Sequence, residues 1–441
     1  MRTNKLLGKV RTSRRTALAL IAATVQGIQL RACRGLLKLN NAEMVLLSKP
    51  RRARLTAVFA ALQFLRRTRA IRCKLCLASI HFKHTQSKHC GRAVYLSGGP
   101  VAVIEPQSDV ITLWPKTKDG KIAEIKIDTL GKLYYALRKY NLTIIGVEFT
   151  THHSEYIGEA PKQFRGYTEQ EAIWPNWDAA QKWSELALSS FHNKNGLSYD
   201  LSNRISFQLN TINNRLRSLS LSYQNQLNAL VLKNKFKAGQ RFQDGYTDLV
   251  YQEFHSFLFD AGILRDNLCE YVYNFSDNGS RKEDGKDVTT ASGLFKLLKK
   301  EVNHTKLESY LKSEMSKGGW LFELGQYRDL VMHSAPINIA NHRLYAIHEP
   351  IALPDGKEIL SVRFPLPSNP SKLYSERCKR NDFDKYIEQF DELSRVSLED
   401  RGEYDCLEYA HKVFGLLSNL SLGKVRISPV LALRVLKVDR C

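Results

Sequence analysis

The chain has 441 residues, enough for two or three domains, and its 43% hydrophobic and 25% charged residues are typical of a globular protein. The net charge is +22, but residues 1–95 hold 21 Lys and Arg against a single acid, Glu43, whereas the remainder holds 45 basic and 43 acidic residues. The near-neutral body disfavours a protein that coats nucleic acid through many phosphate contacts, and no run of about 18 apolar residues is present to span a membrane.

The cysteines indicate the compartment. Four of the eight lie in the basic segment, and the other four are scattered at wide spacing through the rest of the chain. Scattered cysteines in a long chain indicate a reducing environment more than a disulfide framework. We therefore expect a cytoplasmic protein without a membrane partner.

Residues 1–92 form a basic, acid-poor segment for which several interpretations stay open. Arginines within 11–15 precede a short apolar run at 17–25, which is the outline of a secretory or twin-arginine signal. Arg-rich, acid-poor composition also fits an organellar transit peptide. The basic character continues far beyond any cleavage site, so we expect a disordered arm or a non-native extension, with Met44 or a later residue as the true start.

The same segment contains one candidate metal site. Cys73 and Cys76 are followed by His89 and Cys90, and two such pairs have acceptable spacing for zinc ligands. The flanking residues lack strand or helix patterning, so we expect that the protein needs no metal or other cofactor.

Residues 93–165 are predicted to form a small α/β element. Apolar runs and alternation predict strands at 93–96, 101–104, 110–114, 122–127 and 142–149. Asp119 and Gly120 separate the third strand from the fourth and supply the positive φ that a tight hairpin needs. Apolar residues at helical spacing predict a helix at 130–140.

Residues 170–336 read as nearly all helix. Apolar spacings of three and four predict helices at 176–193, 199–233, 247–275, 291–302 and 304–315, followed by a helix that starts at Trp320. Segment 247–275 is the most apolar and should be the central core helix. A polar loop is expected at 276–288.

Residues 337–441 should combine a β-hairpin with helices. The hairpin strands are predicted at 343–347 and 358–364, followed by a proline-containing linker at 365–370. Helices are expected at 382–396 and 402–417, before a weakly patterned tail. The fold class is therefore α+β and predominantly helical.

The helix at 320–334 carries the residues most informative about function. It contains Arg328, Asp329 and, five positions after the arginine, His333, shortly before Pro336 ends the helix. Attack of a ribose 2′-hydroxyl on the adjacent phosphate needs proton transfer, which His333 can provide, and charge stabilisation, which Arg328 can provide. The substrate supplies the nucleophile, so the chemistry needs no metal and is restricted to RNA.

Arg328 and His333 would not point in the same direction on a regular helix. Positions five apart on an ideal helix differ by roughly 140° around the axis. A frayed helix end with a long arginine side chain, or a second copy of the chain, could bring the two groups together. Arg343 and His348 have the same spacing but lie on a predicted strand, where residues five apart point to opposite faces. This second pair, called the decoy pair below, shows that the spacing alone does not identify a site.

Segment 247–335 resembles the HEPN superfamily, whose signature is Arg, four to six residues, then His, near the end of the last core helix, commonly with Asn, Asp or His after the arginine. The resemblance implies a HEPN-like antiparallel helical bundle over roughly 170–335. It implies Arg328 and His333 as the catalytic pair and Asp329 as the residue that orients them. Tyr327 and Ser334 would be substrate-binding wall residues.

The resemblance also implies what the protein does. HEPN proteins of this type are metal-independent endoribonucleases that act as homodimers or higher homo-oligomers, often as toxins or antiviral defence effectors with an antitoxin or defence-system partner protein. Several members only bind nucleotides or RNA. The alternative is therefore a non-catalytic helical module that binds nucleic acid or protein in a bacterial defence or regulatory system.

Overall fold

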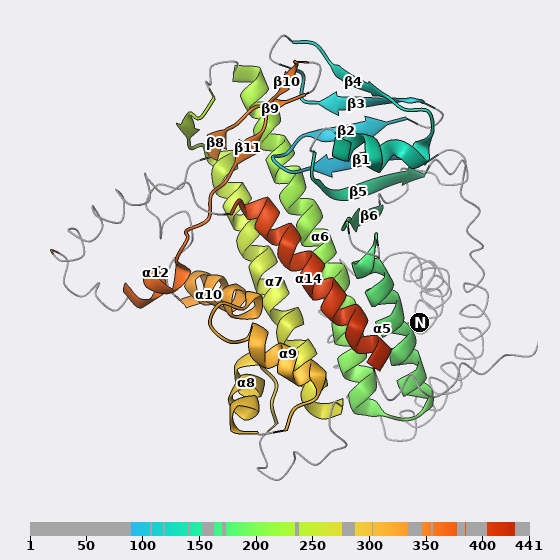
Figure 1. Cartoon of the computed structure of the whole chain (residues 1–441), viewed down its shortest axis with the longest axis vertical. Helices are drawn as coiled ribbons and strands as arrows, with labels where there is room; N and C mark the ends of the chain where they lie inside the picture. The colour runs from blue at the N-terminus through green and yellow to red at the C-terminus, as the bar shows by residue number, and fades with distance from the viewer. Residues whose placement is uncertain are drawn as a thin grey trace, which may run out of the picture. The chain divides into compact units, whose positions relative to one another are not determined.

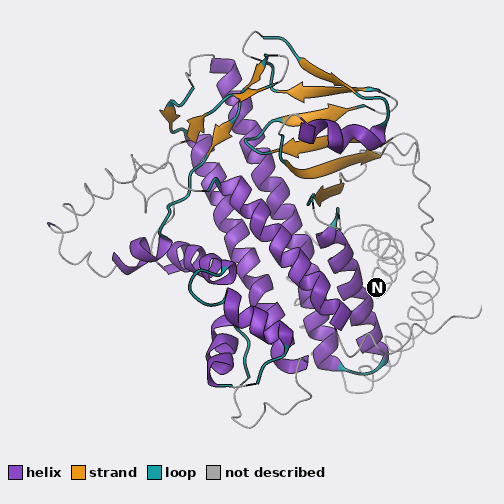
Figure 2. Cartoon of the chain, in the orientation of Figure 1, coloured by secondary structure: helices purple, strands orange, loops and turns teal. Residues whose placement is uncertain are grey.

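The computed structural model describes residues 90–427 with gaps, all within the unit that spans Ser87–Cys441. The gaps are residues 106–107, 118–119, 140–141, 152–162, 170–172, 234–237, 276–286, 302, 334–345, 354–355, 377–383 and 385–403. The fold class is α+β and predominantly helical, as the sequence predicts (Figure 2). No helix in the described part of the chain has the length and apolar character of a membrane span.

Six antiparallel strands form the main sheet, in the order β4-β3-β2-β1-β5-β6. They are β1 (Cys90–Leu96), β2 (Val101–Ile104), β3 (Val110–Trp114), β4 (Ala123–Lys126), β5 (Ile144–Thr151) and β6 (Gln163–Gly166). The five predicted strands are confirmed, and alternation explains them: in β4 Ala123 and Ile125 are buried, whereas Glu124 and Lys126 are exposed. The sixth strand, β6, is absent from the prediction because it is short and Phe164 is its only strong strand former.

The two faces of this sheet pack against different partners. On one face, Leu133 and Leu137 of α4 (Leu133–Lys139), which follows the short 3₁₀ helix η1 (Leu130–Lys132), join the strand side chains in a core. The other face packs on α6 (Gly196–Lys233), where Arg217 Nε donates to Glu148 Oε2 at 2.7 Å. Helix α6 therefore joins the sheet to the helical part of the unit.

Four long helices form the bundle, namely α5 (Pro175–His192), α6, α7 (Gly245–Phe275) and α14 (Cys406–Ile427) (Figure 1). Helix α7 contacts α6, α14 and α10, and its apolar residues Phe254, Phe257, Leu258 and Leu264 are fully buried. The prediction that α7 is a central core helix is confirmed.

The last helix differs from its prediction. A weakly patterned tail was expected after Ser418, whereas α14 continues to Ile427 and lies along α5, α6 and α7. Its serines do not interrupt it, because Ser418 and Ser421 donate to carbonyl oxygens four residues earlier, at 2.6 and 2.7 Å. Trp183 Nε1 also donates to the Ser421 carbonyl at 3.2 Å, which fixes α14 to α5.

Three shorter helices pack at the side of α7. They are α8 (Ala291–Lys300), α9 (Lys306–Glu314) and α10 (Trp320–His333), close to the predicted ranges. Thr305 begins α9 through a capping box with Glu308, which satisfies the free N–H groups of the first turn. The predicted loop at 276–288 lies mostly outside the described residues.

The predicted hairpin is present but is divided into two parts. Strands β9 (Ile351–Ala352) and β10 (Glu358–Ile359) pair near its turn, and β8 (Ala346–His348) pairs with β11 (Val362–Arg363). A short strand that the sequence did not indicate, β7 (Arg241–Phe242), adds to β8. Arg343 of the decoy pair and nearly all of the predicted helix at 382–396 lie outside the described residues.

The segment expected to be a linker is fixed to the bundle. Phe364 and Leu366 are buried, and the carbonyls of Pro365 and Pro367 accept hydrogen bonds from Tyr251 and Tyr327 at 3.3 and 2.8 Å. The segment leads into α12 (Pro370–Glu376), which packs on α10. Residues from the sheet, the bundle and this C-terminal segment thus share one core.

Candidate active site

Helix α10 carries the Arg–His motif and is held by its apolar face. Leu321, Leu324, Tyr327 and Leu330 are buried at successive spacings of three. The helix packs through them against α7 and α12. Arg328 follows Tyr327 and therefore lies at the edge of the buried face, next to α7.

The stem of Arg328 crosses α7 at Gly262. A Cβ atom at Gly262 would lie 2.6 Å from Arg328 Cδ and 3.0 Å from its Nε, so with any other residue at 262 the arginine stem would have to shift from this position. Arg328 Nη1 donates to Asp266 Oδ2 at 3.4 Å, and the Arg328 side chain is 26% exposed. The guanidinium is thus held against α7 while part of it stays accessible to a ligand.

A second arginine crosses between the same two helices in the opposite direction. A Cβ atom at Gly325 of α10 would lie 2.9 Å from Arg265 Nη1. Arg265 is buried and donates from Nε and Nη2 to Asp266 Oδ1 at 3.2 and 3.1 Å. The backbone N–H of Ala291 donates to the same oxygen at 3.1 Å.

These contacts define the Arg265–Asp266–Arg328 cluster. Two guanidinium groups share one carboxylate, so the three side chains together carry one surplus positive charge. Such a charge at a partly exposed position attracts anions, and the fork of an arginine matches the oxygens of a phosphate. The cluster can therefore hold a phosphate at Arg328, and the buried Arg265 adds to the positive electrostatic potential there.

His333 and Asp329 lie on a different face of α10. Both are exposed, and residues four apart are neighbours on a helix surface. Helix α10 stays helical through His333, so the expected fraying does not bring this side chain toward Arg328, and roughly 140° separates the two around the axis.

The two expected wall residues have different outcomes. Tyr327 is 2% exposed, its ring lies 4.9 Å from that of Tyr409, and its hydroxyl donates to the Pro367 carbonyl. Tyr327 is therefore a core residue, which the spacing of the apolar face explains, and its ring does not reach a substrate. Ser334 lies outside the described residues.

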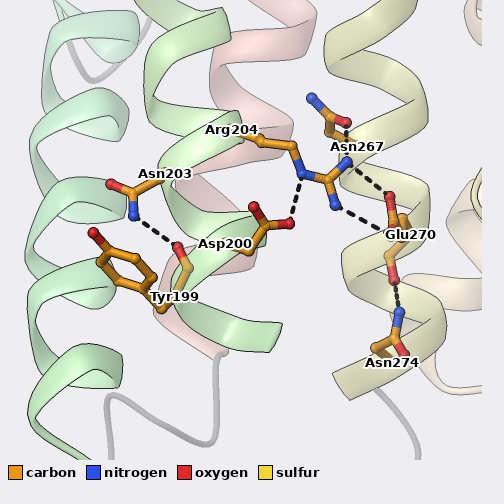
Figure 3. A network of polar contacts seen from close by, with 7 residues as sticks. All are labelled: Tyr199, Asp200, Asn203, Arg204, Asn267, Glu270 and Asn274. Carbon is orange, nitrogen blue, oxygen red and sulfur yellow. Dashed lines mark hydrogen bonds and ion pairs between the residues drawn. The ribbon is translucent and has the colours of Figure 1, made fainter. Parts of the chain in front are cut away.

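Two other acids of α7, Asp260 and Glu270, stabilise the bundle. Asp260 accepts from Arg215 Nε at 2.7 Å and from Gln208 Nε2 at 2.9 Å. One turn from Asp266, Arg204 of α6 donates to both oxygens of Glu270, at 3.1 and 3.2 Å, and also reaches Asp200 and Asn267 (Figure 3). These groups hold α6 against α7 and do not point to a reaction.

The candidate zinc site cannot be placed. Cys73, Cys76 and His89 lie outside the described residues, and the side chain of Cys90, in β1, is also outside them. Among the residues that are described, no group of three or more His, Cys, Asp or Glu side chains could hold a metal ion.

The site residues without a predicted role are Arg265, Asp266, Gly262 and Gly325. A signal for the glycines was present, because glycine inside a helix costs up to about 1 kcal/mol relative to alanine and usually has a packing reason. Gly262 and Gly325 both interrupt apolar helical patterns. What the pattern could not provide was the partner of each glycine, since α7 and α10 are far apart along the chain.

No family model, curated protein or solved structure matches this chain at a significant level.

Proposed function

We propose that the protein is a metal-independent endoribonuclease of the HEPN type. Arg328 holds the scissile phosphate and stabilises its developing charge, and His333 moves the proton of the 2′-hydroxyl or of the leaving oxygen. Asp329, one turn before His333 on the same face, orients the imidazole. The products would carry 2′,3′-cyclic phosphate and 5′-hydroxyl ends, because the nucleophile is the neighbouring 2′-hydroxyl.

The observation that supports this proposal best is the way Arg328 is held. Its stem fits over Gly262, its Nη1 reaches Asp266, and Arg265 binds the same carboxylate. A guanidinium oriented in advance loses little conformational entropy when it binds a phosphate.

The proposal includes a homodimer or higher homo-oligomer, because Arg328 and His333 diverge within one copy. A second copy related by a two-fold axis could place its His333 near the first copy's Arg328. Exposed apolar side chains flank the site, with Met332 43% exposed one turn after Arg328 and Phe259 45% exposed one turn before Gly262. An antitoxin or defence-system partner would act on this assembly.

The test is RNA cleavage in the presence of EDTA. We expect the purified protein to cut total RNA and to leave cyclic phosphate ends, and Arg328→Ala and His333→Ala each to lower the rate at least 100-fold. Circular dichroism should show the same helix content in the variants as in the parent. Unchanged cleavage by the double variant would sink the proposal, and RNA binding without cleavage by the parent would favour the non-catalytic binding module.

A further inference from the structure

A pocket lies outside the candidate active site, where β6, the start of α5 and the middle of α6 meet. It has a volume of about 150 Å³ and is lined by Arg165, Asn176, Trp177, Asn210, Asn213 and Asn214, among others. That volume corresponds to roughly five water molecules, the size of a small planar ring system. Helix α6 contacts β6 and α7, and α7 contacts α10, so the pocket is separated from Arg328 by two helices.

An arginine stacked between aromatic rings forms one wall. The Arg165 guanidinium carbon lies 4.2 Å from the ring centroid of Trp177 and 5.3 Å from that of Phe149. Phe149 in turn packs edge-on against Trp174 at 5.8 Å and lies under Arg92 at 5.6 Å. This packing holds the Arg165 plane in one orientation, while Trp177 stays 37% exposed.

Asparagines of α5 and α6 line the rest of the pocket, and two of them are fixed by hydrogen bonds to the backbone. Asn213 Nδ2 donates to the Phe164 carbonyl at 2.9 Å, and its Oδ1 accepts from Gly166 N at 3.0 Å, which fixes β6 to α6. Asn176 Nδ2 donates to the Leu209 carbonyl at 3.1 Å and fixes α5 to the same helix. Asn210 and Asn214 are exposed, and Asn210 Nδ2 donates to the Ser206 carbonyl at 3.0 Å, which leaves its second N–H and its Oδ1 for a ligand.

The chemistry of these walls selects a ligand class. No carboxylate occurs among the described residues that line the pocket, and one guanidinium does, so an anionic ligand is favoured over a cation. An exposed indole favours a planar ring, because base–aromatic stacking contributes about 1–3 kcal/mol per base. Amides carry a donor and an acceptor side by side, which is the pattern that reads the edge of a base.

We propose that this pocket binds one nucleotide of single-stranded RNA at a distance from the scissile bond. The base stacks on Trp177, the phosphate lies against Arg165, and the amides of Asn210 and Asn214 contact the base edge. The pocket would give the protein affinity for unpaired RNA that its near-neutral body does not otherwise provide. This site does not depend on the ribonuclease chemistry, because it would hold RNA whether or not Arg328 and His333 cleave it.

The test measures RNA binding without cleavage. In a His333→Ala background, fluorescence anisotropy of a labelled single-stranded oligoribonucleotide reports the Kd, and Trp177→Ala should raise that Kd roughly 5- to 100-fold. Asn214→Asp should weaken binding in the same direction, because the isosteric carboxylate repels phosphate next to Arg165. The matched control is Trp114→Ala, since Trp114 is 39% exposed on β3 and is no part of the pocket.

Several outcomes would overturn the pocket assignment. The first is an RNA affinity of the parent that is too weak to measure. The second is the same Kd for the parent, Trp177→Ala and Asn214→Asp. The third is a loss of affinity in the control Trp114→Ala as large as that in Trp177→Ala. Competition by inorganic phosphate as effective as that by a nucleoside monophosphate would show a bare anion site instead. The two proposals can also fail separately. If Trp177→Ala loses RNA binding but His333→Ala alone cleaves RNA as fast as the parent, the pocket assignment stands and only the proposed active site is wrong.

Discussion

At the scale of single residues, burial changes the chemistry of one histidine on α7. His255 lies two turns before Gly262, so the two residues share one face of α7. Burial lowers the pKa of His255 to about 4, so its imidazole is neutral at physiological pH. His333, exposed at the end of α10, is the histidine placed to exchange protons with a substrate, which explains why the motif residue and not His255 carries the proposed chemistry.

The lowered pKa of His255 predicts a loss of stability in acid. The unfolded chain takes up a proton near pH 6.5, whereas the folded protein does so only near pH 4, so the stabilisation is complete above pH 6.5 and is lost as pH falls toward 4. A pKa difference of one between the two states corresponds to about 1.4 kcal/mol, so His255→Gln should reduce the fall in the free energy of unfolding between pH 7 and pH 4 by about 3 kcal/mol. Urea unfolding at several pH values measures it.

The control for this prediction is His192→Gln, at an exposed position on the last turn of α5. It should leave the acid dependence of the unfolding free energy as it is in the parent. Equal slopes for the parent and His255→Gln would contradict the assignment of the effect to this residue.

At the scale of elements, the candidate site depends on how α7 and α10 cross. Each helix contributes one arginine and one glycine, and each arginine passes over the glycine of the other helix. The helices approach closely at these two points, and the carboxylate of Asp266 binds both guanidinium groups. The crossing is what converts Arg328 from a mobile surface side chain into an oriented one.

This crossing predicts the effect of one methyl group. Gly262→Ala places a Cβ 2.6 Å from Arg328 Cδ, so the arginine stem must move away from α7. We expect cleavage to fall roughly 10- to 100-fold, because a displacement of about 1 Å at a catalytic group costs this much, while alanine keeps the helix intact. The measurement is the single-turnover cleavage rate, with far-UV circular dichroism as the check on folding.

Gly423→Ala in α14 provides the matched control. A Cβ atom there would have no neighbour within 4 Å, so the same substitution tests the effect of helix propensity alone. Cleavage should be unchanged in this variant. Equal rates for Gly262→Ala and the parent would mean that the position of Arg328 over Gly262 does not matter to the reaction.

At the scale of the whole molecule, Arg328 and His333 of one copy point in different directions, so the proposed mechanism depends on the oligomeric state. If each site combines Arg328 of one copy with His333 of the other, two inactive variants should complement one another. Mixing Arg328→Ala with His333→Ala after dissociation yields heterodimers in about half of the population, each with one complete site. The mixture should therefore recover about a quarter of the parental activity.

The cleavage assay on the mixture, compared with each variant alone, measures this recovery. Absence of any recovery, although the exchange of subunits is shown by differently tagged copies, would contradict a shared site. Both groups would then have to act within one copy, after α10 unwinds near His333.

Prediction from sequence succeeded where a signal is local. Alternation predicted the five strands β1–β5, and spacings of three and four predicted α5 to α10 to within a few residues, because each pattern reflects which side of one element is buried. It failed for β6 and β7, which are too short to show a pattern. The prediction also ended the last helix at residue 417, because the serines that follow look like a polar tail. In the structure Ser418 and Ser421 donate to carbonyls of α14 itself, so the helix continues.

The candidate site divides in the same way. Arg328, Asp329 and His333 were found from residue type, spacing and position on a helix, and all of this information lies within 14 residues of chain. Only the tertiary structure decided that Arg265 and Asp266 join Arg328, that Tyr327 is a core residue, and that α14 belongs to the bundle. The contact of Arg328 with Asp266 and that of Tyr327 with Tyr409 join residues more than 60 positions apart, and such pairs leave no periodicity that a single sequence can show.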